Sequence, residues 1–436
     1  MAERRRGHAP AECICAALGA ALALVAAASG AEDAAPRPLL RIAYTSDIGG
    51  VLEPCGCSAG QRGGLSRLAT VVARLREQGT PTLVLDGGGL TGSAVQLPYF
   101  AEALAQIGYD GAVPRTEWRQ VGQAAAPDMA AALAAGGLRV LSPPIDAGLV
   151  ATRLDVGGEP VILLVAGDGS VICTRVVGAL QPLGDVASPV VLLVGLPWDE
   201  AEALLPELEG VVDVVLGRPS RGPAYASLVP RAGRTLAPPV ESGGRSVTVV
   251  DVYRSGEAGE RTVRAWLEPV SPWLPADPAV KAVVERYYTE AAPASRPAEA
   301  PKDTVDYVMR GWADAETCGT CHPKELEAWK GTAHAKAIAT LAQAGRLVDE
   351  CLACHSEEFR QRKAFDPVRL VPGDGVTCAT CHGDGLIHSM TGRVDYIRRT
   401  MDAQDCMACH NEERQPAGFD FAASHDKIRH LPAPAE

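Results

Sequence analysis

The sequence has no histidine between His8 and His322, and the other eight of its nine histidines begin at His322. Residues 9 to 321 therefore contain no imidazole, which is the commonest side-chain ligand of metals in proteins. This absence excludes a histidine-ligated metal site from the first three quarters of the chain.

The chain also lacks a long run of lysine and arginine. Its 41 Lys+Arg stand against 53 Asp+Glu, and the formal net charge of −12 argues against nucleic acid as a partner. After the N-terminal segment, no apolar run approaches the roughly 18 residues that a membrane span requires. Hydrophobic residues make up 47% of the chain and charged residues 22%, as in a globular protein. Its 436 residues predict two or three domains.

The N-terminal segment resembles a targeting signal. Arg4–Arg6 are followed by an apolar run from Cys13 to Ala28 and then by the small residues Ser29–Ala31. This order of charge, apolar core and small residues is typical of a secretory signal peptide, here residues 1–31. An uncleaved membrane anchor is the alternative. We expect an exported, soluble, periplasmic protein with no membrane span after cleavage of the signal.

Residues 36–275 alternate between short β-branched runs, such as Thr82–Asp86, and helix-like stretches, such as Leu65–Gln78. Nearly continuous apolar strands that alternate with helices predict an α/β domain with a buried sheet. The runs Val247–Tyr253 and Thr262–Glu268 predict a hairpin or a second sheet layer. A helix and a linker rich in Pro and Ala are expected over residues 276–302.

Residues 303–436 have few strong apolar runs but contain eight cysteines, all within C-x-x-C-H motifs. Two thiols at this spacing can add to the two vinyl groups of one haem, and the histidine that follows can bind its iron. The motifs are Cys318–Cys321–His322, Cys351–Cys354–His355, Cys378–Cys381–His382 and Cys406–Cys409–His410. Paired zinc sites are the alternative. The pattern predicts a mainly α domain whose core is filled by four covalently attached haems c.

Four further histidines match the number of sixth ligands that four haem irons need. They are His334, His388, His425 and His430. Ligation by two histidines predicts low-spin haems with potentials below those of Met/His haems. The competing ligands are Met390, Met401 and Met407.

The region from Cys318 to His430 resembles the cytochrome c-554-like tetrahaem domain. The resemblance rests on CHPKELEAWKGTAHAKA after the first motif, CHGDGLIH at the third, and FDF with KIRH after the fourth. It implies that His334, His388 and His430 are distal ligands. Since His425 falls where this family has no ligand, the resemblance also leaves the haem of His355 as the one with an open iron.

The segment RIAYTSDIGG from Arg41 and the segment LVLDGGG resemble exported metallophosphoesterases of the 5′-nucleotidase, UshA-like type, over about Leu39 to Val270. These enzymes hold two metals with Asp, His and Asn. Asp47 matches the first Asp of their D-x-H motif, but Gly49 stands at its His and Gly89 at the bridging Asp. The remaining motif positions hold Arg115–Trp118, Val194–Gly195 and Pro219–Arg221. The resemblance therefore implies a sandwich scaffold that has lost hydrolysis, with a weak cation site at Asp47 and Asp86 as the alternative.

The first strand is followed by Glu53–Cys57, which reads EPCGC, and then by Gly63–Leu65. This pattern resembles a UshA-like subgroup that includes selenoproteins, which implies that Cys55 and Cys57 form a redox pair. A passive disulfide, a pairing with Cys173 and metal binding are the alternatives. Cys173 itself is expected as an inert thiol in an apolar strand.

Together these features predict a periplasmic electron-transfer cytochrome that exchanges electrons with other redox proteins or with a quinol-linked donor. One alternative is an oxidoreductase that acts on a small molecule, either at an open haem or at the Cys55/Cys57 pair. A metal-dependent phosphoesterase is disfavoured, and an α/β domain that serves only for docking is a fourth possibility.

Overall fold

The computed structural model describes residues 36–429 apart from internal gaps. The gaps are 55–59, 91–94, 115–128, 142–147, 167–172, 184–186, 221–230, 256–259, 292–311, 363–372, 412–413 and 416. The predicted signal segment, Cys55, Cys57 and His430 therefore lie outside the described residues. No helix in the described ranges is long and apolar enough to cross a membrane.

The first sheet has seven strands in the order β4-β3-β2-β1-β10-β11-β9. The strands are β1 (Leu40–Thr45), β2 (Thr82–Asp86), β3 (Gly111–Ala112), β4 (Arg139–Val140), β9 (Arg231–Gly233), β10 (Ser246–Ser255) and β11 (Glu260–Pro269). The strands from β1 to β4 are parallel, and β10 joins them antiparallel to β1. The predicted hairpin is confirmed, because β10 pairs antiparallel with β11.

The second sheet has four strands in the order β5-β6-β7-β8. These are β5 (Leu149–Val156), β6 (Glu159–Ala166), β7 (Val190–Pro197) and β8 (Val214–Arg218). Successive side chains of a strand point to opposite faces. In β6, Val161, Leu163 and Val165 face the first sheet, and Ile162 and Leu164 face the helices outside. Because both faces are covered, the strand sequences are almost continuously apolar.

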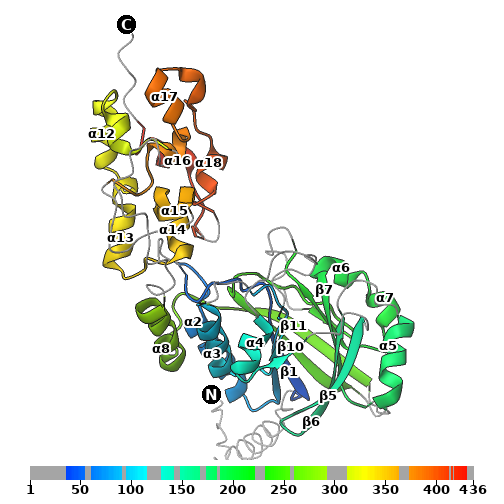
Figure 1. Cartoon of the computed structure of the whole chain (residues 1–436). Helices are drawn as coiled ribbons and strands as arrows, with labels where there is room; N and C mark the ends of the chain where they lie inside the picture. The colour runs from blue at the N-terminus through cyan, green and yellow to red at the C-terminus, as the bar shows by residue number, and fades with distance from the viewer. Residues whose placement is uncertain are drawn as a thin grey trace, which may run out of the picture.

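Helices cover the two outer faces of the sheets. On the first sheet lie α2 (Leu65–Glu77), α3 (Leu97–Ile107), α4 (Met129–Ala135) and α8 (Pro278–Arg286). On the second lie α5 (Cys173–Leu180), α6 (Trp198–Glu202) and α7 (Leu205–Leu208). The domain is thus a four-layered α-β-β-α sandwich, as predicted (Figure 1). Cys173 begins α5 and does not lie in a strand, contrary to expectation.

The C-terminal region consists of short helices and contains no strand among its described residues. They are α11 (Ala315–Gly319), α12 (Pro323–Lys330), α13 (Ala337–Gln343), α14 (Asp349–His355), α15 (Glu357–Arg362), α16 (Cys378–His382), α17 (Leu386–Thr391), α18 (Ala403–Met407) and α19 (Phe421–His425), with the 3-10 turns η4 (His334–Lys336) and η5 (Val394–Tyr396). The predicted mainly α architecture is confirmed. Its two clusters of buried apolar side chains are centred on three residues each, Ile338, Leu341 and Leu352 in one and Ala315, Leu326 and Trp329 in the other.

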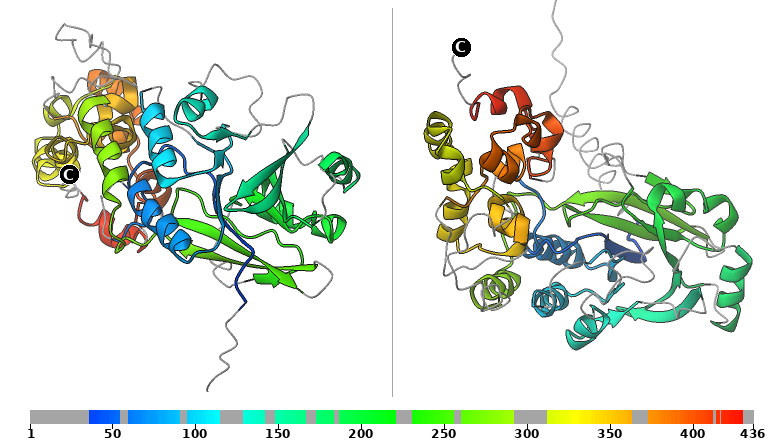
Figure 2. Two further views of the ribbon diagram at one scale, coloured as in Figure 1. Left: turned by 90° about the horizontal axis from the view of Figure 1, so that it is seen from below. Right: turned by 45° about the horizontal axis from the view of Figure 1, so that its top comes forward.

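The C-terminal helices lie on the side of the sandwich that carries α2 and α8, far from α5 and α7 (Figures 1 and 2). The segment before α14 makes the junction, and Val348 belongs to the same buried cluster as α2, α3 and α8. Gln96 donates to Glu350 over 2.6 Å, and the Arg346 guanidinium lies 4.0 Å from the centre of the Tyr288 ring. The π-helical turn η3 (Tyr287–Ala291), which follows α8, supplies this tyrosine.

Candidate functional site

The four C-x-x-C-H motifs lie on or directly after short helices. The second lies at the end of α14 and the third forms the whole of α16, while the first and fourth begin in α11 and α18. One helical turn brings side chains three positions apart onto the same face. The turns are closed by backbone bonds, with His322 N donating to Cys318 O over 3.0 Å and His410 N donating to Cys406 O over 2.8 Å. Each motif therefore presents two thiols and a histidine within one compact turn.

The motifs come together in two pairs. The thiols of Cys318 and Cys378 lie within hydrogen-bond reach of each other, so the first motif adjoins the third. Cys354 and Cys409 are in the same relation, so the second adjoins the fourth. Groups attached at these sulfurs would be close neighbours in pairs.

Two pairs of imidazoles have the separation that axial ligation requires. The ring centres of His322 and His388 are 6.2 Å apart at an interplanar angle of 25°, and those of His334 and His410 are 6.2 Å apart at 44°. Two imidazoles on opposite sides of one metal ion, each bonded at about 2 Å, have ring centres about 6 Å apart. The separation of the ring centres in each pair is therefore the one that two histidines bound to one iron would have.

The protonation of these rings also suits metal binding. His388 Nδ1 lies 3.0 Å from Arg393 O, an arrangement that makes Nε2 the metal-binding nitrogen of that ring, and His382 Nδ1 lies 2.6 Å from Arg398 O. Burial lowers the pKa of His334 and of His410. The neutral imidazole is the form that binds a metal.

The other predicted ligands are not brought into such pairs. His355 Nδ1 lies 3.0 Å from Ala337 O, and its ring stacks on no second imidazole in the described part of the chain. The ring of His425 lies on Phe421, with centres 5.2 Å apart, within α19. His430 cannot be placed, since it lies outside the described residues.

The apolar surface of the C-terminal region suits a haem-filled core. Seven large hydrophobic side chains are exposed in the described residues, and five of them lie between residues 387 and 407. They are Ile387, Met390, Val394, Tyr396 and Met407. So many exposed apolar side chains in one short stretch indicate a surface that another group covers. The porphyrins of the adjoining motifs are suitable in size and polarity.

Among the described residues, no three His, Cys, Asp or Glu side chains form a cluster able to hold a metal ion. Histidines that come together in pairs match the two axial positions of a haem iron. They do not match structural zinc, which takes four ligands in a tetrahedron.

In the sandwich domain, Arg218 lies against Asp47, the residue that matches the first Asp of the D-x-H motif. At the end of β8, its Nη2 and Nε lie 3.0 and 3.3 Å from the carboxylate of Asp47. Asp47 is also the one described residue besides glycine with positive φ, 52°. A Cβ at Gly89 would lie 1.9 Å from Asp47 Oδ1, so no bridging aspartate fits there.

Asp86, the other retained carboxylate, is completely buried below this ion pair. It accepts hydrogen bonds of 2.8 Å from Thr45 Oγ1 and from Gly88 N. Burial raises the pKa of Asp86 from 3.8 to about 7. Asp47 is thus paired with Arg218, and Asp86 is hydrogen-bonded to Thr45 and Gly88.

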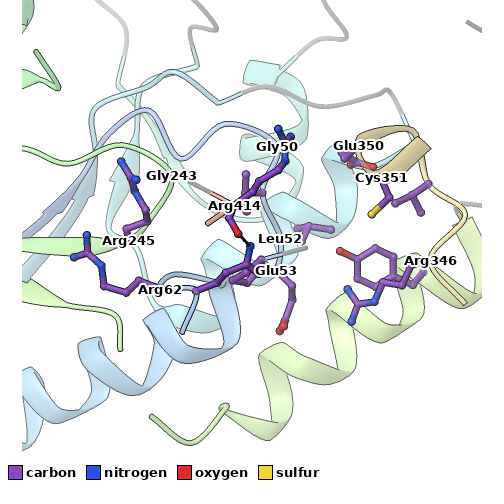
Figure 3. Close-up of a pocket in the computed structure, with 15 residues that line it drawn as sticks. Gly50, Leu52, Glu53, Arg62, Gly243, Arg245, Arg346, Glu350, Cys351 and Arg414 are labelled. Carbon is purple, nitrogen blue, oxygen red and sulfur yellow. Dashed lines mark hydrogen bonds between the residues drawn. The ribbon is translucent and has the colours of Figure 1, made fainter. Parts of the chain in front are cut away.

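A small pocket lies at the junction of the two regions, and the sequence analysis did not anticipate it. We call it the junction pocket; its volume is about 90 Å³. The sandwich domain and η3 supply Gly50–Pro54, Gln61, Arg62, Gly243, Arg245 and Tyr288, and the C-terminal region supplies Arg346, Val348, Glu350, Cys351 and Arg414. In Figure 3, Arg346, Glu350 and Cys351 lie on one side, Arg62 and Arg245 on the other, with Leu52 and Glu53 between them. No sequence motif signals a pocket whose walls are some 300 residues apart.

The C-terminal region is similar to known c-type cytochromes. A family model described as cytochrome c554 and c-prime matches residues 317–383. Cytochrome c-554 of Nitrosomonas europaea is 28% identical over 137 residues, which cover 23% of this chain and 57% of that cytochrome. The match thus spans little more than half the length of the relative. The predicted resemblance is confirmed, and it indicates covalently bound haem c.

Solved structures with a similar arrangement include two phosphoesterase-like proteins. The sulfate thiohydrolase SoxB of Thermus thermophilus is 17% identical, with a TM-score of 0.42 over 67% of this chain and 69% of that one. The 5′-nucleotidase precursor of the same species is 15% identical, with a TM-score of 0.44 over 80% of this chain and 73% of that one. At this level of similarity, neither protein bears on the activity of the chain.

Proposed function

We propose that this protein is an exported tetrahaem c-type cytochrome that transfers electrons. Bound haem c supplies reversible one-electron transfer at iron. The observation that carries the proposal is the 6.2 Å separation in each of two histidine pairs, since in each pair one partner belongs to a C-x-x-C-H motif. The eight motif cysteines would hold the four haems through thioether bonds.

The distances support one assignment of axial ligands. His322 would share an iron with His388, and His410 with His334. The resemblance implies that His430 is a distal ligand, and we assign it to the iron of His382. His355 would keep an open sixth position, and His425 would bind no iron.

The α/β sandwich would serve as a scaffold without hydrolytic activity. The Asp47–Arg218 ion pair supports this, because it engages the matching carboxylate, and so does Gly89, because a side chain there would clash with Asp47. The partners would be other redox proteins or a quinol-linked donor. The neighbouring thiols of Cys318 and Cys378, and of Cys354 and Cys409, would keep adjoining haems close enough to exchange electrons.

The ligand assignment is tested by electron paramagnetic resonance on the oxidised protein, after a pyridine haemochrome assay of haem content. We expect four haems per chain, three low-spin signals and one high-spin signal. His388→Ala should convert one further haem to high spin, because its iron loses the sixth ligand. The matched variant His425→Ala should leave every signal unchanged. Fewer than about three haems per chain would refute the proposal, and a spin change in His425→Ala would refute the assignment.

A second function, thiol oxidoreduction, is favoured by the position of the residues that flank Cys55 and Cys57. Pro54 and Gln61, on either side of the segment 55–59, line the same pocket as Cys351. The pair would pass two electrons, one at a time, from its dithiol form to the haem at Cys351 and Cys354, releasing two protons and forming a disulfide. Stopped-flow reduction of the haems by a small dithiol should slow at least several-fold in Cys55→Ser/Cys57→Ser, while Cys173→Ser should behave as the wild type. Equal rates in all three proteins would exclude this function.

A further inference from the structure

The junction pocket carries an excess of positive charge. Four arginines line it, Arg62, Arg245, Arg346 and Arg414, against the two carboxylates of Glu53 and Glu350. Glu350 is mostly buried and accepts hydrogen bonds from Gln96 and Tyr287, so two neighbouring donors already engage its carboxylate. Glu241 bonds to Arg62 through both carboxylate oxygens and also pairs with Arg245 over 3.7 Å, so that Arg346 and Arg414 supply the excess charge. A site of this charge favours an anion.

Two donors in the pocket lack partners of their own. The flat face of the Arg346 guanidinium rests on the Tyr288 ring, 4.0 Å from its centre. This stacking leaves the N–H groups at the edge of the guanidinium available. In the described part of the chain, neither these N–H groups nor the Tyr288 hydroxyl has a hydrogen-bond partner. They can therefore bond a ligand without giving up an existing bond.

The size of the pocket limits the ligand. A volume of about 90 Å³ accommodates several waters, since one water needs at least about 10–15 Å³. An ion of four or five non-hydrogen atoms fits in this volume. Planar guanidinium groups match the oxygen pairs of oxyanions better than they match a spherical halide.

We propose that the junction pocket binds a small oxyanion, held by Arg346 and the Tyr288 hydroxyl, beside the sulfur of Cys351. Cys351 lines the pocket, and the charges of Glu350, Arg346 and Arg414 act on it. The functional consequence rests on the proposed haem attachment at Cys351. A negative charge held beside that haem favours its ferric form and so lowers its reduction potential. Binding would thus link the sandwich domain to the redox state of the second haem.

The test uses the full-length, haem-loaded protein, with haem content measured first. Sulfate is titrated by calorimetry at constant ionic strength, with chloride as the comparison ion. We expect saturable binding of one sulfate per chain and a lower midpoint potential for one haem. Arg346→Gln should weaken sulfate binding about 10-fold or more, because a charge-assisted bond is lost. Tyr288→Phe should weaken it less. The control Arg234→Gln removes a surface arginine that pairs with Glu260, away from the pocket, and should bind as the wild type does.

The outcomes separate the two proposals. Four haems per chain without saturable sulfate binding would overturn the oxyanion site and leave the tetrahaem function standing. Equal affinity of Arg346→Gln and Arg234→Gln for sulfate would also overturn the oxyanion site, since the ion would then bind elsewhere. Binding that leaves all haem potentials unchanged would contradict the placement beside Cys351. A chain with too few haems would refute the tetrahaem function, whatever its affinity for sulfate.

Discussion

At the scale of single residues, Asp86 shows how burial changes the chemistry of a retained carboxylate. It lies three residues before Gly89, which stands at the bridging-Asp position, and its side chain is buried and bonded to Thr45 and the backbone. Which donors surround a carboxylate is decided by the fold, so sequence could identify Asp86 as a candidate but not its neutral form. The partner of Arg218 is likewise decided by the fold, because its ion pair with Asp47 joins one sheet to the other.

Asp86 predicts a pH dependence of stability. Its pKa is about 7 in the folded protein against an ordinary 3.8, so between these values the folded state binds more protons than the unfolded state. The free energy of unfolding should therefore fall as pH rises from about 4 to about 7, by up to about 1.4 kcal/mol per unit, and level off above. Urea denaturation followed by circular dichroism at several pH values measures this. Asp86→Asn should flatten the dependence, while Asp155→Asn, which changes an exposed side chain, should not. A rise in stability across this window would contradict the argument.

At the scale of elements, the segment leading into α14 joins the two regions. Val348 is 3% exposed and packs with α3 and α8, and Cys351 follows within one turn. Sequence periodicity predicted the helices and strands well, because α2 and the β10–β11 hairpin have strong local patterns. It could not predict this junction, because the contacts link positions about 250 residues apart, such as Gln96 and Glu350.

Val348→Ala should destabilise the sandwich domain even though Val348 lies in the C-terminal region. Removing two methyl groups from a buried site costs about 1–2 kcal/mol, through lost burial and the cavity left behind. Thermal unfolding followed in the far ultraviolet should show a lower midpoint. Val177→Ala is the matched control, because Val177 is 38% exposed on α5, and its midpoint should stay close to that of the wild type. Equal effects of the two changes would mean that the junction contributes nothing to stability.

At the scale of the whole molecule, the two regions differ in what stabilises them. Among the described residues, the sandwich has three extensive clusters of buried apolar side chains, whereas the C-terminal region has two clusters of three. A region with so little buried apolar area cannot offset the loss of chain entropy on folding. The haems would make up the difference.

Protein produced without haem attachment should therefore keep a folded sandwich and lose the fold of its C-terminal region. Limited trypsin digestion, with fragments identified by mass spectrometry, should cut freely after residue 311 and leave a resistant core from residues 36 to 291. The haem-loaded protein should resist cleavage in both regions. Equal resistance of the haem-free and haem-loaded C-terminal regions would show that haem is not needed for its fold.

The sequence by itself determined the chemistry that local spacing encodes. C-x-x-C-H motifs place two thiols and an imidazole within one helical turn, and the lack of histidine between His8 and His322 excludes a histidine-ligated metal site whatever the fold. Which histidines face each other, that Arg218 lies against Asp47, and that Arg346 and Cys351 share a pocket with Glu53 were decided only by the tertiary structure. The physical reason is the separation along the chain of the residues that interact. A turn is set by bonds between neighbouring residues, whereas these contacts depend on how sheets and helices distant in sequence pack.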